Sequence, residues 1–276
     1  MASAEEHEGE DLASPEQAIV YHAILHENET ELERSSAALA WSGLAAGLMM
    51  GFSFLPVGLL HAHLPNTKWR ILLTSFGYTI GFVIIILGRQ QLFTENTLTV
   101  VLPLMARRHR GSLGNVARVW AIVLATNVVG TLLFALVLAK TEMVDAETWQ
   151  SLKTAAEEAH RGSFAVTLLR AIIAGWLIAL VVWLVPFAET AKVAVIVILT
   201  WLISAGHFVH IVAGTVEVGF LVFAGARTWA EFFGSFFIPT LIGNIIGGVC
   251  LVAALNHAQM QAENEDEDDS EGIIIA

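Results

Sequence analysis

Residues 88–97 read GRQQLFTENT and residues 206–210 read GHFVH, and each of these polar segments interrupts a long apolar stretch. In a lipid bilayer an unpaired backbone N–H or C=O is so costly that a helix is broken at membrane depth only where it lines a cavity or is buried in protein. Two breaks at matching places in the two halves of a chain indicate a substrate path near the middle of the membrane. The sequence therefore predicts a membrane protein that transports something small.

The composition agrees with a membrane protein. Of the 276 residues, 55% are hydrophobic and 14% are charged, and the mean hydropathy is +0.66. In an ordinary soluble domain roughly 25% of the residues are charged. A chain of this length holds about six membrane spans of ~20 residues, with tails at both ends.

The formal net charge of −12 comes from the two ends of the chain. Residues 1–33 carry ten Asp and Glu and residues 257–276 carry seven, with no Lys or Arg in either segment. No soluble segment carries a basic patch, so we expect no nucleic-acid partner. Cys250 is the single cysteine, which excludes a disulfide framework and a cysteine-based metal site.

The pattern of hydropathy and charge divides the chain into four parts. We expect an acidic disordered tail at 1–13, an amphipathic helix at 14–35, a transmembrane transporter domain at 36–256 and an acidic disordered tail at 257–276. The predicted spans are about 36–62, 70–106, 114–139, 164–187, 191–226 and 232–256. The second and fifth are too long for a single crossing, so we expect two half-helices in each.

An internal repeat relates the two halves of the domain. Residues 127–131 (NVVGT) in the third span match residues 244–248 (NIIGG) in the sixth, and residues 46–48 (AGL) pair more weakly with residues 174–176 (AGW). Because three is an odd number, consecutive trios of spans enter the membrane in opposite orientations. We therefore expect an all-α membrane protein with six transmembrane helices in a 3+3 inverted repeat, in which helices 2 and 5 are broken.

The orientation is predicted from one cluster of arginines. Six spans put both termini on one side, and Arg107, Arg108 and Arg110 follow the second span. Basic residues in short loops favour the cytoplasmic side, so we expect both termini in the cytoplasm. Over all short loops the proposed inside has six Lys and Arg and the outside has seven, so the prediction depends on this cluster.

His210 is the first candidate for a functional side chain. A histidine between two apolar half-helices can donate hydrogen bonds to an anion, and its protonation can change near neutral pH. A lone histidine in apolar surroundings is more often a packing residue, but its position inside an intramembrane break favours a function. His207 lies three residues earlier, yet two histidines without further carboxylate or thiolate ligands make a poor zinc site, so we expect no metal.

The first break supplies hydroxyl and amide groups from Thr94, Asn96 and Thr97. They can cap the second half-helix, which we expect to begin near Asn96, or they can contact a substrate. Both roles can hold at once, and for Thr94 we favour substrate contact. The matching half-helix of the second break is expected to begin near Gly214, and both helix N-termini would present positive dipole ends to the cavity.

Three charged side chains and two asparagines are predicted to support the breaks. Arg89, Glu95 and Glu217 lie at membrane depth, where a charge needs a partner or water. We expect a structural Arg89–Glu95 or Arg89–Glu217 ion pair, with direct substrate contact as the alternative. Asn127 and Asn244 are each followed by small residues, and we expect them to tie the breaks to neighbouring helices.

Several large apolar side chains near the breaks can form constrictions or simply pack in the core. These are Tyr78, Phe82, Phe93, Ile203 and Phe208.

Over about 34–256 the chain resembles the formate/nitrite transporter family. Residues 238–248 (IPTLIGNIIGG) resemble the signature of the family's last span, residues 92–94 (LFT) its first-break motif, and residues 208–213 (FVHIVA) its second-break motif around a central histidine. Residues 89–97 resemble most closely a divergent branch from the bacterial inner membrane.

The resemblance implies an aquaporin-like protomer of six helices in a homopentamer in the plasma (bacterial inner) membrane, with one pore per protomer and no enzymatic activity or cofactor. It implies small monovalent anions of weak acids as substrates: formate, nitrite, acetate, lactate or hydrosulfide, with protons. His210 would interact with the anion or its proton between two apolar constrictions. Thr94 would lie on a loop that gates together with the N-terminal helix. Leu92 and Phe93, with Tyr78 and Ile203, would form the constrictions.

The chain also departs from the family pattern. The family commonly has Glu directly before the central histidine and Asn four residues after it, where this chain has Val209 and Gly214. The basic residue often found before span four is replaced around residues 157–158 by two glutamates, although His160 and Arg161 are close. In the first break, Glu95 is an additional acid.

Two other functions remain as alternatives. A neutral-solute pore for water or glycerol fits the paired breaks, although no Asn-Pro-Ala motif is present at either. An intramembrane enzyme would use His207, His210 and Glu217 as a metal or acid–base site, but it lacks an Asp-rich or Cys-containing cluster.

Overall fold

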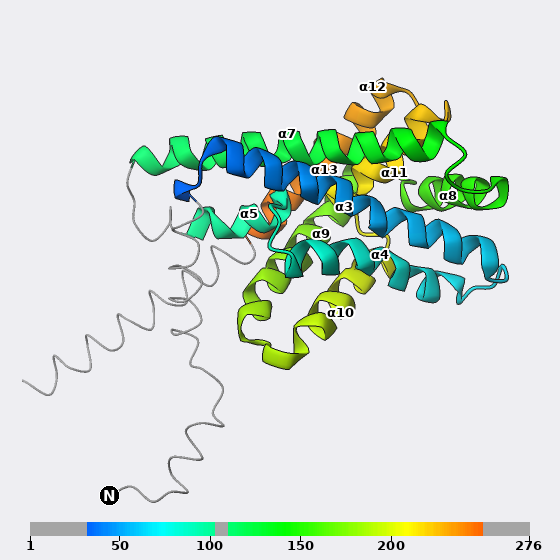
Figure 1. The fold of residues 1–276 in the computed structure, drawn as a ribbon, viewed down its shortest axis with the longest axis horizontal. Coiled ribbons are helices and arrows are strands. Elements are labelled where there is room, and N and C mark those ends of the chain that lie inside the picture. Colours follow the sequence, from blue (N-terminus) through cyan, green and yellow to red (C-terminus); the bar gives the residue numbers. More distant parts are fainter. Residues whose placement is uncertain (1–31, 103–109, 251–276) are drawn as a thin grey trace, which may run out of the picture.

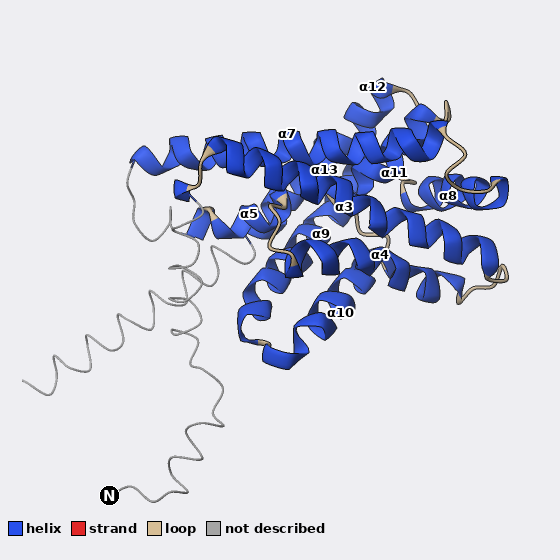
Figure 2. Cartoon of the chain, in the orientation of Figure 1, coloured by secondary structure: helices blue, strands red, loops and turns tan. Residues whose placement is uncertain are grey.

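The computed structural model describes residues 32–102 and 110–250, and these residues form helices and loops without a strand (Figure 2). The α-helices of the described residues in chain order are α3 (Ser36–His63), α4 (Arg70–Leu87), α5 (Phe93–Thr99), α7 (Arg110–Lys140), α8 (Ala146–Ala159), α9 (Phe164–Leu184), α10 (Lys192–Ala205), α11 (Ile211–Phe223), α12 (Trp229–Glu231) and α13 (Ile238–Gly248) (Figure 1). Short 3₁₀ turns at Val185–Phe187 and Glu189–Ala191 connect α9 to α10, and a π-helix at Phe232–Phe237 connects α12 to α13.

Five helices among the described residues are long and apolar enough to cross a membrane. They are Ser36–His63, Arg70–Leu87, Leu113–Lys140, Phe164–Phe187 and Trp229–Gly248. Large apolar side chains on these helices and on α10 face outward, for example Trp41, Leu169 and Ile198, which are 73%, 64% and 62% exposed. So many exposed apolar side chains are expected where lipid covers the surface.

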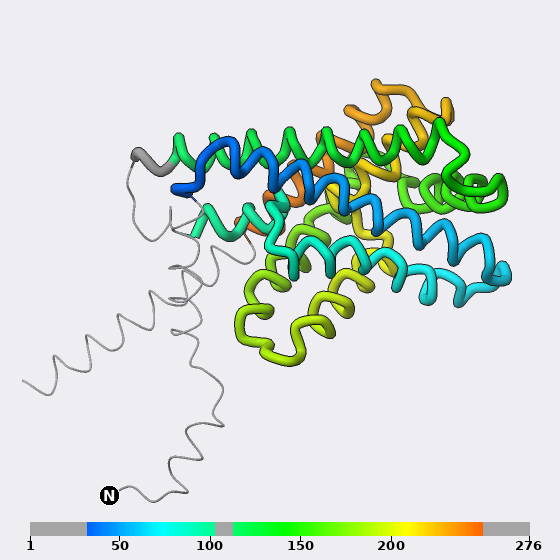
Figure 3. Tube along the Cα trace, viewed as in Figure 1, coloured from blue at the N-terminus to red at the C-terminus, as the bar shows by residue number. Residues whose placement is uncertain are grey.

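The helices pack in two similar groups. In one, α3 runs along α7 and also contacts α4; in the other, α9 runs along α13 and also contacts α10 (Figures 1 and 3). The groups are joined because α11 packs against α7 and α5 packs against α9. The short helices α5 and α11 therefore lie in the interior, between the two groups.

Glycines allow the closest helix contacts in each group. A Cβ atom on Gly47 of α3 would lie 2.4 Å from the carbonyl oxygen of Asn127 on α7. A Cβ atom on Gly175 of α9 would lie 2.3 Å from the carbonyl oxygen of Asn244 on α13. Both positions come from the segments that the sequence pairs as a repeat, and both need glycine because any side chain would collide with a neighbouring backbone.

The chain leaves helical geometry in the same way at both breaks. Gly88 and Gly206 end the preceding helices, and the next residues, Arg89 and His207, have positive φ values of 50° and 51°. The chain then becomes extended, and α5 and α11 begin at Phe93 and Ile211. Both half-helices begin three residues earlier than the expected Asn96 and Gly214, because the extended N-cap residues are Leu92 and His210.

Helix α8 was not predicted from the sequence. Its N-cap is Asp145, whose carboxylate accepts hydrogen bonds from the Thr148 N–H at 2.8 Å and the Thr148 hydroxyl at 3.0 Å. These bonds hold the pKa of Asp145 below its ordinary value. Buried Leu152 and Ala156 face α3 and α11. An Asp N-cap before an amphipathic segment was the missed signal.

Several predicted boundaries fall outside the described residues. They are those of the tail at 1–13, nearly all of the helix at 14–35, the end of the second span at 103–106 and the tail at 257–276. The last helical segment begins at Trp229 rather than at 232, because Thr228 and Glu231 form a capping box there.

Candidate functional site

Asn127 holds the first break from the side of α7. Its Oδ1 accepts a hydrogen bond from the Phe93 N–H at 2.9 Å, and its Nδ2 donates to the carbonyl oxygens of Gln91 at 2.9 Å and of Gly43 at 2.8 Å. The buried side chain thus pairs backbone groups on both sides of Leu92, where the helix is interrupted.

Asn244 on α13 makes the matching set of bonds at the second break. Its Oδ1 accepts from the Ile211 N–H at 2.8 Å, and its Nδ2 donates to the carbonyl oxygens of Val209 at 3.0 Å and of Ala171 at 2.8 Å. The two asparagines therefore tie the breaks to neighbouring helices. The same three bonds at both breaks are what a repeated unit would produce.

The capping role considered for the first-break side chains is wrong. No side chain caps α5 at its N-cap residue, and the first N–H of the helix is paired by Asn127 instead. The Thr97 hydroxyl donates back to the Thr94 carbonyl at 2.7 Å, and Asn96 Nδ2 donates to Gln91 Oε1 at 3.0 Å. An asparagine from a facing helix can pair the backbone groups at the break because its amide both accepts and donates hydrogen bonds.

His210 and Thr94 meet where the two breaks approach each other. Both side chains are buried, and 2.7 Å separates His210 Nε2 from Thr94 Oγ1. The Ala213 N–H donates to His210 Nδ1 at 3.2 Å, so Nδ1 is an acceptor and carries no proton. In the neutral ring the proton is therefore on Nε2, which donates to the Thr94 hydroxyl oxygen.

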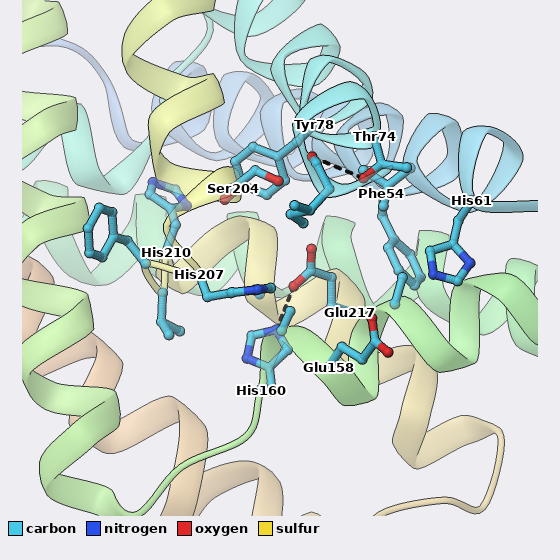
Figure 4. Close-up of a pocket in the computed structure, with 17 residues that line it drawn as sticks. Phe54, His61, Thr74, Tyr78, Glu158, His160, Ser204, His207, His210 and Glu217 are labelled. Carbon is cyan, nitrogen blue, oxygen red and sulfur yellow. Dashed lines mark hydrogen bonds and ion pairs between the residues drawn. The ribbon is translucent and has the colours of Figure 1, made fainter. Parts of the chain in front are cut away.

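A pocket leads from the side of the protein with α8 to His210. Its volume is about 60 Å³, which is room for several waters or a very small anion, because one water needs roughly 10–15 Å³. Figure 4 shows its polar lining, which includes Thr74, Tyr78, Ser204, His207 and His210. Ionisable groups further along the wall are His61, Glu158, His160 and Glu217.

Glu217 is paired differently from the prediction. Its carboxylate oxygen Oε2 is 2.5 Å from His160 Nε2, so the expected Arg89–Glu217 pair is wrong. Arg89 lies exposed after α4, whereas His160 directly follows α8 and contacts Glu217 on α11. The Arg89–Glu95 alternative stays a prediction.

His160 was noticed in the sequence only as a neighbour of two glutamates, because its partner lies 57 residues away. In the fold its ring packs edge to face on Phe236 with 5.2 Å between centroids. A Cβ on Gly214 would be 3.0 Å from His160 Cε1. The absent side chain at Gly214 makes room for the imidazole.

The large apolar candidates lie in two places. Tyr78 and Phe208 line the pocket, and Phe82 packs edge to face on His210 at a centroid distance of 5.0 Å. Leu92, Phe93 and Ile203 are fully or almost fully buried and do not line the pocket. Phe93 packs on Trp120, so its ring is also part of the core between α5 and α7.

The apolar outer surface, the interrupted helices and the buried polar centre define a membrane transport protein rather than an enzyme. The family model described as "Formate/nitrite transporter" matches residues 18–258. The chain therefore belongs to the formate/nitrite transporter family.

Curated relatives cover most of the chain. It is 42% identical over 248 residues to inner membrane protein YfdC of Escherichia coli (strain K12), and the aligned region covers 90% of this chain and 80% of that protein. It is 30% identical to the uncharacterized transporter YrhG of Bacillus subtilis (strain 168), over 68% of this chain and 72% of that protein. It is 24% identical to formate channel BtFdhC of Bacillus thuringiensis, over 91% of this chain and 97% of that protein.

Solved structures share the fold. A pentameric formate channel with formate bound has a TM-score of 0.67 at 19% identity and covers 90% of this chain and 100% of that chain. An ion channel of the same family has a TM-score of 0.69 at 20% identity and covers 86% of this chain and 96% of that chain.

Proposed function

We propose that this transporter conducts small monovalent anions of weak acids, such as formate or nitrite, past His210. The observation that carries the proposal is the contact between His210 Nε2 and Thr94 Oγ1 at the inner end of the pocket. In this arrangement Nε2–H donates to the Thr94 hydroxyl oxygen. A hydroxyl that accepts from Nε2 keeps its own proton for an arriving anion.

The apolar surroundings explain why a shared proton matters. A carboxylate loses a great deal of solvation on entering a dry site, whereas the neutral acid loses far less. Phe82 packs on His210, and Leu92 is fully buried beside Thr94 in the chain. A hydrogen bond from the Thr94 hydroxyl, which itself accepts from His210 Nε2–H, would lower the cost of bringing the anion between these side chains.

The wider architecture is proposed with the function. The matching asparagine bonds support six spans in a 3+3 inverted repeat, in which α4 with α5 and α10 with α11 form the broken crossings. We propose an aquaporin-like protomer in a homopentamer, because the fold matches a channel described as pentameric. The protein would lie in the bacterial inner membrane with both termini in the cytoplasm.

The loop that carries Thr94 would gate the pore together with the amphipathic segment at 14–35, most of which lies outside the described residues. Leu92, Phe93, Phe208, Tyr78 and Ile203 would form its constrictions.

Stopped-flow uptake into proteoliposomes tests the proposal. The panel is formate, acetate, lactate, nitrite and hydrosulfide, compared for the wild-type chain and His210→Ala. The matched control is His63→Gln, since His63 is exposed, lies outside the pocket and bonds only the Leu59 carbonyl among the described residues. We expect wild type and control to conduct at least one anion and His210→Ala to conduct it more slowly. Equal fluxes through wild type and His210→Ala for every anion would refute the role of His210.

Osmotic swelling in glycerol, measured on the same vesicles, separates the remaining alternative. Swelling without anion flux would identify a neutral-solute pore.

A further inference from the structure

The geometry at His210 leaves the source of a transferable proton unexplained. Its Nδ1 already accepts a hydrogen bond from the Ala213 N–H. A proton on Nδ1 would replace this bond by a repulsive contact between the ring N–H and the Ala213 N–H. The ring is thus arranged to donate one hydrogen bond from Nε2 while it remains neutral. If the anion crosses as the neutral acid, another group must supply the proton before the anion reaches His210.

We propose that the His160–Glu217 pair is the proton-exchange group of this transporter and protonates the anion in the pocket. The proposal rests on the function proposed above. Both residues line the pocket that leads to His210, and their side chains are only 5% and 11% exposed. Figure 4 shows the two side chains joined in the pocket wall, with His207 close to them.

The contacts of His160 are those of an oriented acid–base group. Glu217 Oε2 accepts from Nε2–H, and a carboxylate in that position fixes the tautomer and steadies the imidazolium. Within the described part of the chain no hydrogen bond occupies Nδ1, which is therefore left to exchange a proton. Arg227 donates to the His160 carbonyl at 2.7 Å, and Phe236 and Gly214 enclose the ring.

The proposed step is a single proton transfer. The Nδ1–H bond of the imidazolium breaks, its electron pair stays on Nδ1, and an O–H bond forms on the carboxylate or nitrite oxygen. The neutral acid then moves to His210 and Thr94, and His160 regains a proton from the solution at the pocket mouth. No oxidant, reductant or other co-reactant is needed.

Other charged or titratable side chains line the pocket or lie near the residues that line it. They are His61 on α3, Arg70 and Tyr78 on α4, Glu158 on α8, Arg161 directly after His160, Arg170 on α9, His207 and His210 at the second break, and Arg227 after α11. Neither Lys nor Arg is among the residues that line the pocket, so its charged carboxylates would disfavour a bare anion. A proton donor in the wall offsets that repulsion.

The test measures formate uptake over a pH series for His160→Gln and Glu217→Gln. Glutamine at 160 keeps an N–H for Glu217 but cannot exchange a proton. General acid–base groups contribute about 100-fold or more, so near neutral pH we expect uptake to fall by about that factor. At acidic pH the substrate arrives already protonated, and we expect both variants to approach the wild-type rate. His63→Gln should follow the wild type throughout.

Chemical rescue separates proton exchange from a structural role. His160→Ala opens space beside Gly214, and imidazole added to the vesicles should restore uptake near neutral pH. Uptake that falls equally at every pH without rescue, or variants with the wild-type pH profile, would overturn the proposal. A wild-type chain that conducts no anion at any pH would instead overturn the proposed function.

Discussion

Replacing Asn244 by alanine should strongly destabilise the protein. The substitution removes three buried hydrogen bonds, to the Ile211 N–H and to the carbonyl oxygens of Val209 and Ala171. Side-chain hydrogen bonds in membrane proteins contribute about 0.6 kcal/mol each and up to about 1.7, so we expect a loss of about 2 to 5 kcal/mol. Asn244→Asp should also be destabilising, because a carboxylate accepts from the N–H but cannot donate to the two carbonyls.

Equilibrium unfolding in mixed detergent micelles, followed by tryptophan fluorescence, measures this loss. Ile242→Ala is the matched control on the same helix, since Ile242 is 43% exposed on the outer surface. Asn127→Ala should cost as much as Asn244→Ala, because Asn127 makes an equivalent set of bonds. The reasoning fails if both asparagine variants lose no more stability than the control.

Two further substitutions probe the site and the helix contacts. Thr94→Val removes the hydroxyl that contacts His210 and should slow anion uptake about tenfold, as expected for the loss of about 1.4 kcal/mol. Thr94→Ser keeps the hydroxyl and should retain uptake. Equal uptake rates for the Val and Ser variants would contradict a role of the hydroxyl. Gly175→Ala places a Cβ 2.3 Å from the Asn244 carbonyl oxygen and should lower stability in the same unfolding assay by about 1 to 3 kcal/mol. Gly234→Ala, where no atom lies within 4 Å of the added carbon, is the control that should lose little, and the contact argument is wrong if it loses as much as Gly175→Ala.

Much of the fold follows from patterns within single segments. The long apolar runs predict α3, α7 and α9 to within a few residues, and the polar segments predict where the chain leaves helical geometry. The starts of α5 and α11 were misplaced because the N–H groups of these helices are paired by asparagines on other helices. Helix α8 was missed because its apolar side faces the protein interior over a short segment and gives no span-length signal.

The site could be predicted only in part. His210 and Thr94 are recognisable from their positions in the breaks, and their mutual contact is a consequence of how the two helix groups meet. The partner of Glu217 could not be predicted, because His160 comes from a segment 57 residues away and its fit depends on the missing side chain at Gly214.

The asparagine bonds have a mechanical consequence for the pore. Freeing one break from its asparagine would cost about 2 to 5 kcal/mol. Since 1.4 kcal/mol corresponds to a factor of ten in population, the freed form would be about one molecule in 30 to about one in 4,000. The first break is held further by Ser42, whose hydroxyl accepts from the Gln91 N–H at 3.0 Å and donates to the Gln90 side chain at 3.0 Å. The backbone at the centre of the molecule is therefore a rigid frame. In the proposed pore, a change in aperture would therefore come from side chains such as Phe208, which lines the pocket, rather than from the backbone.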